Sequence, residues 1–276
     1  MPELAEVELS RRRWDVALHL PVRDVRCARA DARVLREVNH DALREALVGA
    51  ALSRSEARGK QLAFRFGDRG DRWLGLHLGM TGELLVLPAD HAPERHDHLV
   101  IETPTAALVF RDPRGFGRVR FERREDEPAW WSSLAPSVLD ASFTLPALQG
   151  FLTRHGRAPL KAVLLRQERF PGVGNWMADE ILWRAGLHPA RRAGALDGAE
   201  VARLRRAVRR VARDALTAIA EDWSYPASWL FAHRWTDGGD CPRCAQALRR
   251  QPIGGRTTCW CPGCQRPPSR PTRAEG

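Results

Sequence analysis

The sequence has no uninterrupted run of 18 apolar residues, the length that a membrane-spanning helix requires. Its first 13 residues, MPELAEVELSRRR, contain no apolar stretch of the kind that forms the core of a secretory signal. The 276 residues contain no internal repeat, so the sequence does not indicate a repeat architecture. We therefore expect a cytosolic protein whose cysteines are reduced.

Acidic residues are the minority among the charged ones. The chain has 34 Asp and Glu against 44 Lys and Arg, which gives a net charge of +10 and a pI of about 10.4. This balance favours a polyanion as partner, nucleic acid first and an anionic membrane second. The length suggests two domains, or one domain with a small appendage. An apolar content of 43% is enough for ordinary cores.

Cysteine is scarce, but four of the six residues stand in two pairs near the C-terminus with the spacing C-x2-C-x16-C-x2-C. This spacing is typical of a zinc ribbon with four thiolate ligands. Such a closed site is structural rather than catalytic, and thiolates suit Zn²⁺. The alternative is two disulfides, which the absence of a signal sequence disfavours. The predicted ligands of one Zn²⁺ are Cys241, Cys244, Cys261 and Cys264.

The other two cysteines are expected to be thiols. Cys27 is interpreted as a buried residue of a strand, and Cys259 lies close enough to a predicted ligand to compete for the metal. Residues 241–276 also contain seven arginines and a single acid, Glu275. A small metal-bound hairpin rich in arginine is a plausible binder of phosphate.

The pattern of apolar residues changes along the chain. Residues 51–122 alternate between apolar and polar positions and predict several short strands, as in a sandwich or barrel. Residues 126–137 are interpreted as a linker, and helical periodicity follows. Asn175 is expected to cap a helix after a glycine turn. A long helix over 197–219 has six arginines off its apolar stripe, interpreted as a solvated basic face.

Four blocks of sequence, taken together, resemble one family. They are Met1–Glu8 with the start MPELAEVE, Arg58-Gly-Lys60 before a strand, 167–180 with PGVGN, and 254–265 with GGR before CPGCQ. In this order they resemble the bacterial formamidopyrimidine-DNA glycosylases, the helix–two-turn–helix family that includes endonuclease VIII. The Pro-Glu-Leu start is similar to the formamidopyrimidine branch.

The resemblance implies an α+β multidomain fold. We expect an N-terminal β-sandwich flanked by helices, then a helix–two-turn–helix domain with a four-cysteine zinc finger. The expected bounds are 1–130 for the catalytic sandwich, 138–225 for the helical domain, 232–270 for the zinc finger and 271–276 for a disordered tail. The implied partner is double-stranded DNA containing damaged bases or abasic sites, bound by a monomer in the bacterial cytoplasm, at the nucleoid.

The implied activity is base-excision repair: a DNA glycosylase for oxidised purines that is also a lyase at abasic sites. The nucleophile would be Pro2, exposed as a secondary amine when Met1 is removed. An α-amine has a pKa of about 8, so much of it is unprotonated near neutral pH. It would form a Schiff base with the sugar, followed by β- and δ-elimination. Glu3 would be the acid/base carboxylate, and Glu6 resembles the family's second N-terminal acid.

The resemblance also assigns DNA-binding residues. Lys60, which the resemblance counts with Pro2 and Glu3 among the catalytic residues, corresponds to a lysine at the phosphates of the damaged nucleotide. Asn175 and Arg256 correspond to further phosphate contacts. Met80 resembles the methionine that intercalates when the base is turned out, and Arg114 and Phe116 resemble the other two residues that fill the void. His96 is assigned to DNA binding with them. For Met80 and Phe116 the alternative is ordinary core packing, which the flanking glycines disfavour.

The sequence departs from the family in two places. Gly115 stands where a second basic residue is common, and 224–235 differs from the usual bacterial segment, which includes the loop over oxidised guanine. Residues 224–235 are more similar to the plant branch of the family, so the sequence does not decide which lesion is preferred. Two alternatives for function remain: a non-catalytic zinc-ribbon protein that binds damaged or bent DNA, and an oxidised-pyrimidine glycosylase of the same fold.

Overall fold

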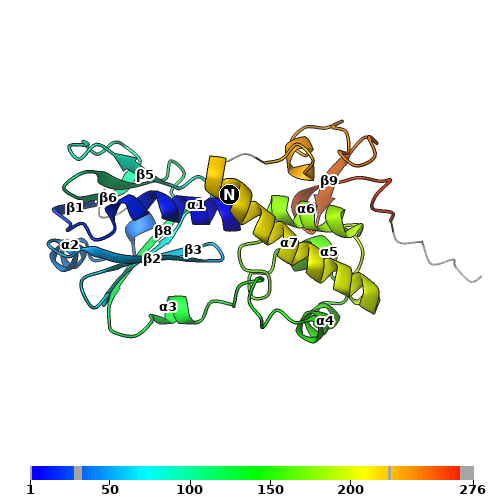
Figure 1. The fold of residues 1–276 in the computed structure, drawn as a ribbon, viewed down its shortest axis with the longest axis horizontal. Coiled ribbons are helices and arrows are strands. Elements are labelled where there is room, and N and C mark those ends of the chain that lie inside the picture. The colour runs from blue at the N-terminus through cyan, green and yellow to red at the C-terminus, as the bar shows by residue number, and fades with distance from the viewer. Residues whose placement is uncertain (1, 28–32, 223–224, 268–276) are drawn as a thin grey trace, which may run out of the picture. The chain divides into compact units, whose positions relative to one another are not determined.

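The computed structural model describes residues 2–27, 33–222 and 225–267, without the side chains of 219–222. The chain divides into two compact units, Met1–Leu134 and Ala135–Gly276. Unit 1 contains strands β1 to β8, and unit 2 contains helices α4 to α7 and strands β9 and β10 (Figure 1). Among the described residues, no helix combines the length and the apolar character that crossing a membrane would need.

Unit 1 is a sandwich of two antiparallel sheets, each with four strands. The first sheet has the order β2-β3-β4-β8, and its strands are Leu52–Arg58, Gln61–Phe66, Arg72–His77 and Arg118–Arg123. The second has the order β1-β6-β7-β5, and its strands are Asp24–Cys27, Asp97–Glu102, Ala107–Arg111 and Glu83–Leu87. Side chains from both sheets, among them Phe64, Leu74 and Phe110, form one buried core. The prediction of strands throughout 51–122 is therefore confirmed.

Two helices complete unit 1. Helix α1 (Leu4–Trp14) packs on strands of both sheets, and the buried Trp14 ring lies 4.7 Å from Phe64 while its indole N–H donates to the carbonyl of Leu85 at 3.1 Å. Helix α2 (His40–Leu47) begins after Asn39, whose side chain accepts a hydrogen bond from the Ala42 N–H at 3.0 Å. Cys27 lies in strand β1, as expected, but it is half-buried rather than buried, because it is the last residue of that strand.

The segment expected as a linker is partly fixed to the first sheet. It contains the short helix α3 (Ala129–Ser132), and Trp131 is fully buried against Ala63 and Trp73. The ring of Trp130 lies so close to Gly75 that a Cβ added there would meet it at 2.6 Å. The linker therefore adds a layer to unit 1 before the chain enters unit 2.

Unit 2 is mainly helical and ends in a two-stranded hairpin. Its helices are α4 (Leu145–Arg154), α5 (Leu160–Leu164), α6 (Asn175–Ala185) and α7 (Gly198–Asp222). The hairpin consists of β9 (Arg249–Ile253) and β10 (Arg256–Trp260). A 3-10 turn, η4 (Leu230–His233), precedes the hairpin. Helix α7 packs on α6 and α4, and strand β10 packs on α6. The hairpin is thus attached to the helix that follows the glycine turn.

Candidate functional site

Helix α1 begins at the residue next to the predicted nucleophile. Glu3 is its N-cap and is buried, with 2% of its surface exposed. The Glu6 carboxylate accepts a hydrogen bond from the Glu3 N–H at 3.2 Å, as in a capping box. Pro2 is partly exposed. The first turn thus places a shielded carboxylate directly beside the residue that would carry the reactive amine.

Lys60 lies at the tip of a hairpin. Strands β2 and β3 pair with Arg58 opposite Gln61, so Gly59 and Lys60 form a two-residue turn. Gly59 has a φ of +61°, which favours glycine at the first position of such a turn. Burial lowers the pKa of His77 on the neighbouring strand, and the charge of Lys60 lowers it further. His77 is therefore a neighbour of Lys60 whose pKa is lowered, and no sequence motif indicated that the two residues would lie close together.

Met80 and Phe116 protrude from two turns that lie side by side. A Cβ on Gly79 would meet the Phe116 carbonyl carbon at 2.5 Å, so the two backbones are in direct contact. Met80 is 42% exposed and Phe116 44% exposed, which makes the core-packing interpretation wrong. The Arg114 guanidinium lies 4.9 Å from the Phe116 ring. The structure thus brings together all three predicted void-filling residues.

A buried carboxylate joins these two turns. Asp112 is 1% exposed; it accepts hydrogen bonds from the Thr81 hydroxyl at 2.8 Å and from the Gly117 N–H at 2.7 Å. Its own N–H donates to the His96 carbonyl at 3.0 Å, which places partly exposed His96 at the base of the same turn. Asp112 was not among the predicted site residues, although an Asp before Pro-Arg-Gly is a recognisable turn signal.

The turn between α5 and α6 is held by one side chain. The Gln167 amide donates to the carbonyls of Leu165 and Val173 at 3.0 and 2.9 Å and accepts from the Gly172 N–H at 3.1 Å. Gly172 has a φ of +86°, which favours glycine. The glycine turn predicted from PGVGN is therefore present, with Gln167 closing it.

The prediction that Asn175 caps α6 is wrong. Gly174 is the N-cap, and Asn175 is the first helical residue. Its amide nitrogen donates instead to the Thr257 carbonyl at 3.0 Å, while its Oδ1 atom is buried and accepts no hydrogen bond in the described part of the chain. Because its side chain bonds the hairpin carbonyl, Asn175 does not cap the helix N-terminus. As a result Asn175 is bonded to the residue next to Arg256.

A glycine pair orients the hairpin that carries Arg256. The residues Gly254 and Gly255 have φ values of +62° and +78°, which suit the two-residue turn between β9 and β10. A Cβ on Gly254 would meet the Ala162 side chain of α5 at 2.7 Å. The turn therefore lies flat on α5, and exposed Arg256 follows it directly. The predicted phosphate contacts Asn175 and Arg256 are thus held in one place.

Three buried charges connect the hairpin to the helices. Lys161 is fully buried, and its ammonium donates to Asp179 at 2.6 Å and to the Asn175 carbonyl at 2.6 Å. The second Asp179 oxygen accepts from Arg234 at 2.6 Å and from the Cys259 N–H at 3.0 Å. This cluster could not be predicted from the sequence, because its members are far apart in the chain.

We expect Asp179→Ala to destabilise unit 2 by about 3–5 kcal/mol, because the charges of Lys161 and Arg234 would stay buried without their counterion. Urea unfolding of the metal-loaded protein, followed by tryptophan fluorescence, measures the change. The control is Glu168→Ala, which removes an exposed partner of Arg166 and should cost at most about 1 kcal/mol. Equal losses in the two variants would contradict a stabilising role for the cluster.

The four paired cysteines come together around one point. Their sulfur atoms all lie within 4.8 Å of one another, with separations such as 3.9 Å between Cys241 and Cys264 and 3.4 Å between Cys244 and Cys261. Four thiolates about 2.3 Å from a tetrahedral zinc would be about 3.8 Å apart, so the residues fit a bound metal ion. All four are free thiols, which contradicts the disulfide alternative. Cys259 is buried outside this group.

Comparison with known proteins gives a consistent result. Residues 1–119 match the family model of the formamidopyrimidine-DNA glycosylase N-terminal domain, and residues 134–224 match that of the formamidopyrimidine-DNA glycosylase H2TH domain. The formamidopyrimidine-DNA glycosylases of Roseiflexus sp. (strain RS-1) and Alkalilimnicola ehrlichii are each 36% identical over 96% of this chain and 100% of their own.

A solved structure agrees with the fold. The Lactococcus lactis formamidopyrimidine-DNA glycosylase, non-covalently bound to DNA containing an abasic site, superposes with a TM-score of 0.84 at 25% identity. The match covers 96% of this chain and 100% of that one. The predicted α+β fold, with N-terminal sheets and a C-terminal helix–two-turn–helix domain, is therefore confirmed.

Proposed function

Because the chain belongs to the formamidopyrimidine-DNA glycosylase family, we propose that it removes oxidised purines from duplex DNA and then cleaves the strand at the abasic site. The observation that carries the proposal is Pro2 beside the buried carboxylate of Glu3, in a chain that matches whole members of the family. The relatives are named as glycosylases of this kind, and the solved neighbour binds abasic-site DNA.

The chemistry begins at the N-terminal amine. With Met1 removed, the Pro2 nitrogen attacks the C1′ carbon of the damaged nucleotide, and the bond from C1′ to the base breaks as the base leaves with a proton. The C1′–O4′ bond of the sugar ring then breaks, O4′ takes up a proton, and the iminium that results between the Pro2 nitrogen and C1′ makes the C2′ protons acidic. Loss of one such proton expels the 3′ phosphate, and a second elimination expels the 5′ phosphate. Glu3 transfers protons in these steps, as its position beside Pro2 allows.

The other residues bind and position the DNA. We assign phosphate contacts to Lys60, Asn175 and Arg256, and the last two are supported by the hydrogen bond from Asn175 to the hairpin. The metal is proposed to be one structural Zn²⁺ held by the four clustered thiolates. Its role is to fix the hairpin, and no step of the reaction passes through it. The protein is proposed to act as a monomer on the bacterial nucleoid.

The activity is tested with duplexes that contain 8-oxoguanine, formamidopyrimidine, a hydantoin or thymine glycol. We expect excision of purine-derived lesions, strand cleavage, and a covalent protein–DNA adduct when borohydride is present. Excision of thymine glycol alone would support the pyrimidine alternative. Tight binding to all four duplexes without excision or adduct would contradict the proposal and favour the non-catalytic binder.

We expect Met80→Ala to slow excision of a paired lesion by at least tenfold. Unstacking a base costs a few kcal/mol, and the exposed methionine offsets part of this cost by filling the void. Cleavage at a pre-formed abasic site should change by less than threefold, since no base must leave. The measurement is single-turnover kinetics on both substrates. The control is Val86→Ala, another exposed apolar residue of unit 1. Equal decreases in rate on both substrates would contradict the assignment of Met80 as a void-filling residue.

A further inference from the structure

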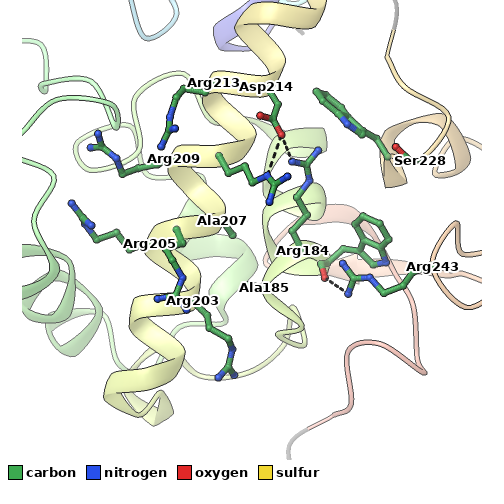
Figure 2. A pocket seen from close by; sticks show the side chains of 14 residues that line it. Arg184, Ala185, Arg203, Arg205, Ala207, Arg209, Arg213, Asp214, Ser228 and Arg243 are labelled. Atoms are coloured by element: carbon green, nitrogen blue, oxygen red, sulfur yellow. Dashed lines mark hydrogen bonds and ion pairs between the residues drawn. The ribbon is translucent and has the colours of Figure 1, made fainter.

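A second basic surface lies in unit 2, at the opposite end of α6 from Asn175. It is an open pocket of about 920 Å³, formed by the last turn of α6, one face of α7, residues 228–229 and the first cysteine knuckle. Figure 2 shows arginine side chains from α6, α7 and the knuckle around it. Eight of the 14 described residues that line the pocket are arginines, and one, Asp214, is acidic.

Most of this positive charge is not compensated. Asp214 is engaged by Arg184 at 2.5 Å. Arg205 donates to the Phe143 carbonyl at 2.7 Å, and Arg209 donates to the Leu139 carbonyl at 2.9 Å. These two contacts correct the expectation that every arginine of this helix is merely solvated. A carbonyl fixes a guanidinium in place without neutralising it, so the contacts hold charge at the pocket.

Four further arginines form a stripe along α7. They are Arg203, Arg206, Arg210 and Arg213, spaced three and four residues apart and therefore on one face of the helix. All four are exposed. Arg206 and Arg213 have no acidic partner among the described residues. The stripe is about 15 Å long at 1.5 Å per residue, a length over which duplex DNA presents roughly nine phosphate charges.

The stripe is separate from the proposed lesion-binding contacts of unit 2. Asn175 begins α6, and the pocket meets the last turn of the same helix at Trp183, Arg184 and Ala185. Ten residues of helix separate the two ends, which corresponds to about 15 Å. One bound phosphate cannot contact both places. The pocket therefore lies apart from the residues assigned to the damaged strand in this unit.

The lining favours a nucleic acid over a protein. Protein interfaces combine arginine with accessible aromatic anchors, whereas both tryptophans of the pocket are covered: Trp183 is 5% and Trp229 is 7% exposed. The Arg243 and Arg184 guanidiniums lie 4.2 and 4.7 Å from these rings. What remains accessible is guanidinium, which matches phosphate geometry and gives no reading of sequence.

We propose that this pocket binds the sugar–phosphate backbone of a second, undamaged DNA segment while the protein holds its lesion. The inference goes beyond the proposed function, because it concerns DNA that is neither damaged nor cleaved. Such a contact lets one molecule bridge two duplexes and pass from one to the other. Its affinity should be independent of sequence and should fall steeply with salt.

The test uses the full, zinc-loaded protein bound to a donor-labelled duplex with a tetrahydrofuran abasic-site analogue. An undamaged duplex with an acceptor dye is then added, and energy transfer reports the ternary complex. In the variant R206Q/R210Q/R213Q we expect at least tenfold weaker capture of the second duplex. The magnitude of the slope of log affinity against log salt should decrease by about 2.7, because each of the three lost phosphate contacts contributes roughly 0.9. Affinity for the analogue should change by less than twofold.

The control R54Q/R69Q/R124Q removes three exposed arginines from unit 1 and should leave capture unchanged at the same net charge. Equal capture by the two variants, or no ternary complex with the wild-type protein, would overturn the inference. Displacement of the second duplex by poly-glutamate at a lower charge concentration than by unlabelled DNA would assign the pocket to an acidic protein instead. A protein that excises no lesion but shows Arg206-dependent capture would leave the inference intact and refute only the enzymatic proposal.

Discussion

Replacing Cys244 with Ser, or chelating the metal, is expected to release one zinc and weaken binding to lesion DNA by at least 100-fold, while unit 1 stays folded. The hairpin has only two strands and a small apolar cluster around Trp183, Leu230 and Leu248, too little to fold alone. In zinc-finger peptides the metal supplies about 10–16 kcal/mol. Without it, Arg256 loses its orientation, and the hydrogen bond from Asn175 to Thr257 loses its acceptor strand.

The measurements are zinc content, binding to the abasic-site analogue, and circular dichroism for the sheets of unit 1. The matched control is Cys27→Ser, which changes a half-buried thiol of unit 1 outside the metal group and should keep both zinc and affinity. A metal-free protein that binds lesion DNA as tightly as the zinc-loaded one would show that the hairpin does not depend on the metal.

Blocking the Pro2 nitrogen is expected to reduce excision by more than about 10³-fold, which corresponds to about 4 kcal/mol of activation free energy. Two residues added before Pro2 would convert its amine into an amide, which cannot attack the sugar. Pro2→Gly keeps a primary amine and should retain part of the activity. Single-turnover excision and borohydride trapping measure both variants, and intact mass establishes that Met1 is absent from the active protein.

Peptide mapping of the trapped adduct decides between amines. The crosslink should lie at residue 2, and Lys60→Gln should weaken DNA binding without preventing trapping by the N-terminus. Lys161 is fully buried in its ion pair with Asp179, so it should never be crosslinked. An adduct at Lys60, or full activity of the extended chain, would refute the assignment of Pro2.

Local features of unit 1 and of the turns were predictable because they depend on residues close together in sequence. Alternating apolar positions predicted the strands of 51–122. The glycine turn before α6 and the clustering of four thiols also followed from spacing alone. In each case the pattern has one low-energy arrangement, whatever the rest of the chain does.

Where a local interaction competes with a contact to a distant part of the chain, the sequence was a poor guide. Asn175 has the residue type of a cap, yet its amide bonds Thr257, 82 residues away along the chain, and Gly174 takes the cap position. For Met80 and Phe116 the flanking glycines disfavoured core packing, but only the exposure of the two side chains excluded it. That exposure depends on close contact between two turns from different parts of the sheet, which Gly79 permits.

The sequence by itself thus determined the fold class, the strand and helix pattern, the grouping of four cysteines and the family, because these follow from periodicity, spacing and short motifs. Only the tertiary structure decided which charges are buried together, as with Lys161, Asp179 and Arg234, and which arginines of α7 share a pocket with Arg184 and Arg243. The physical reason is that desolvation and charge repulsion act between side chains that chain folding brings together, and no local pattern records which ones will meet.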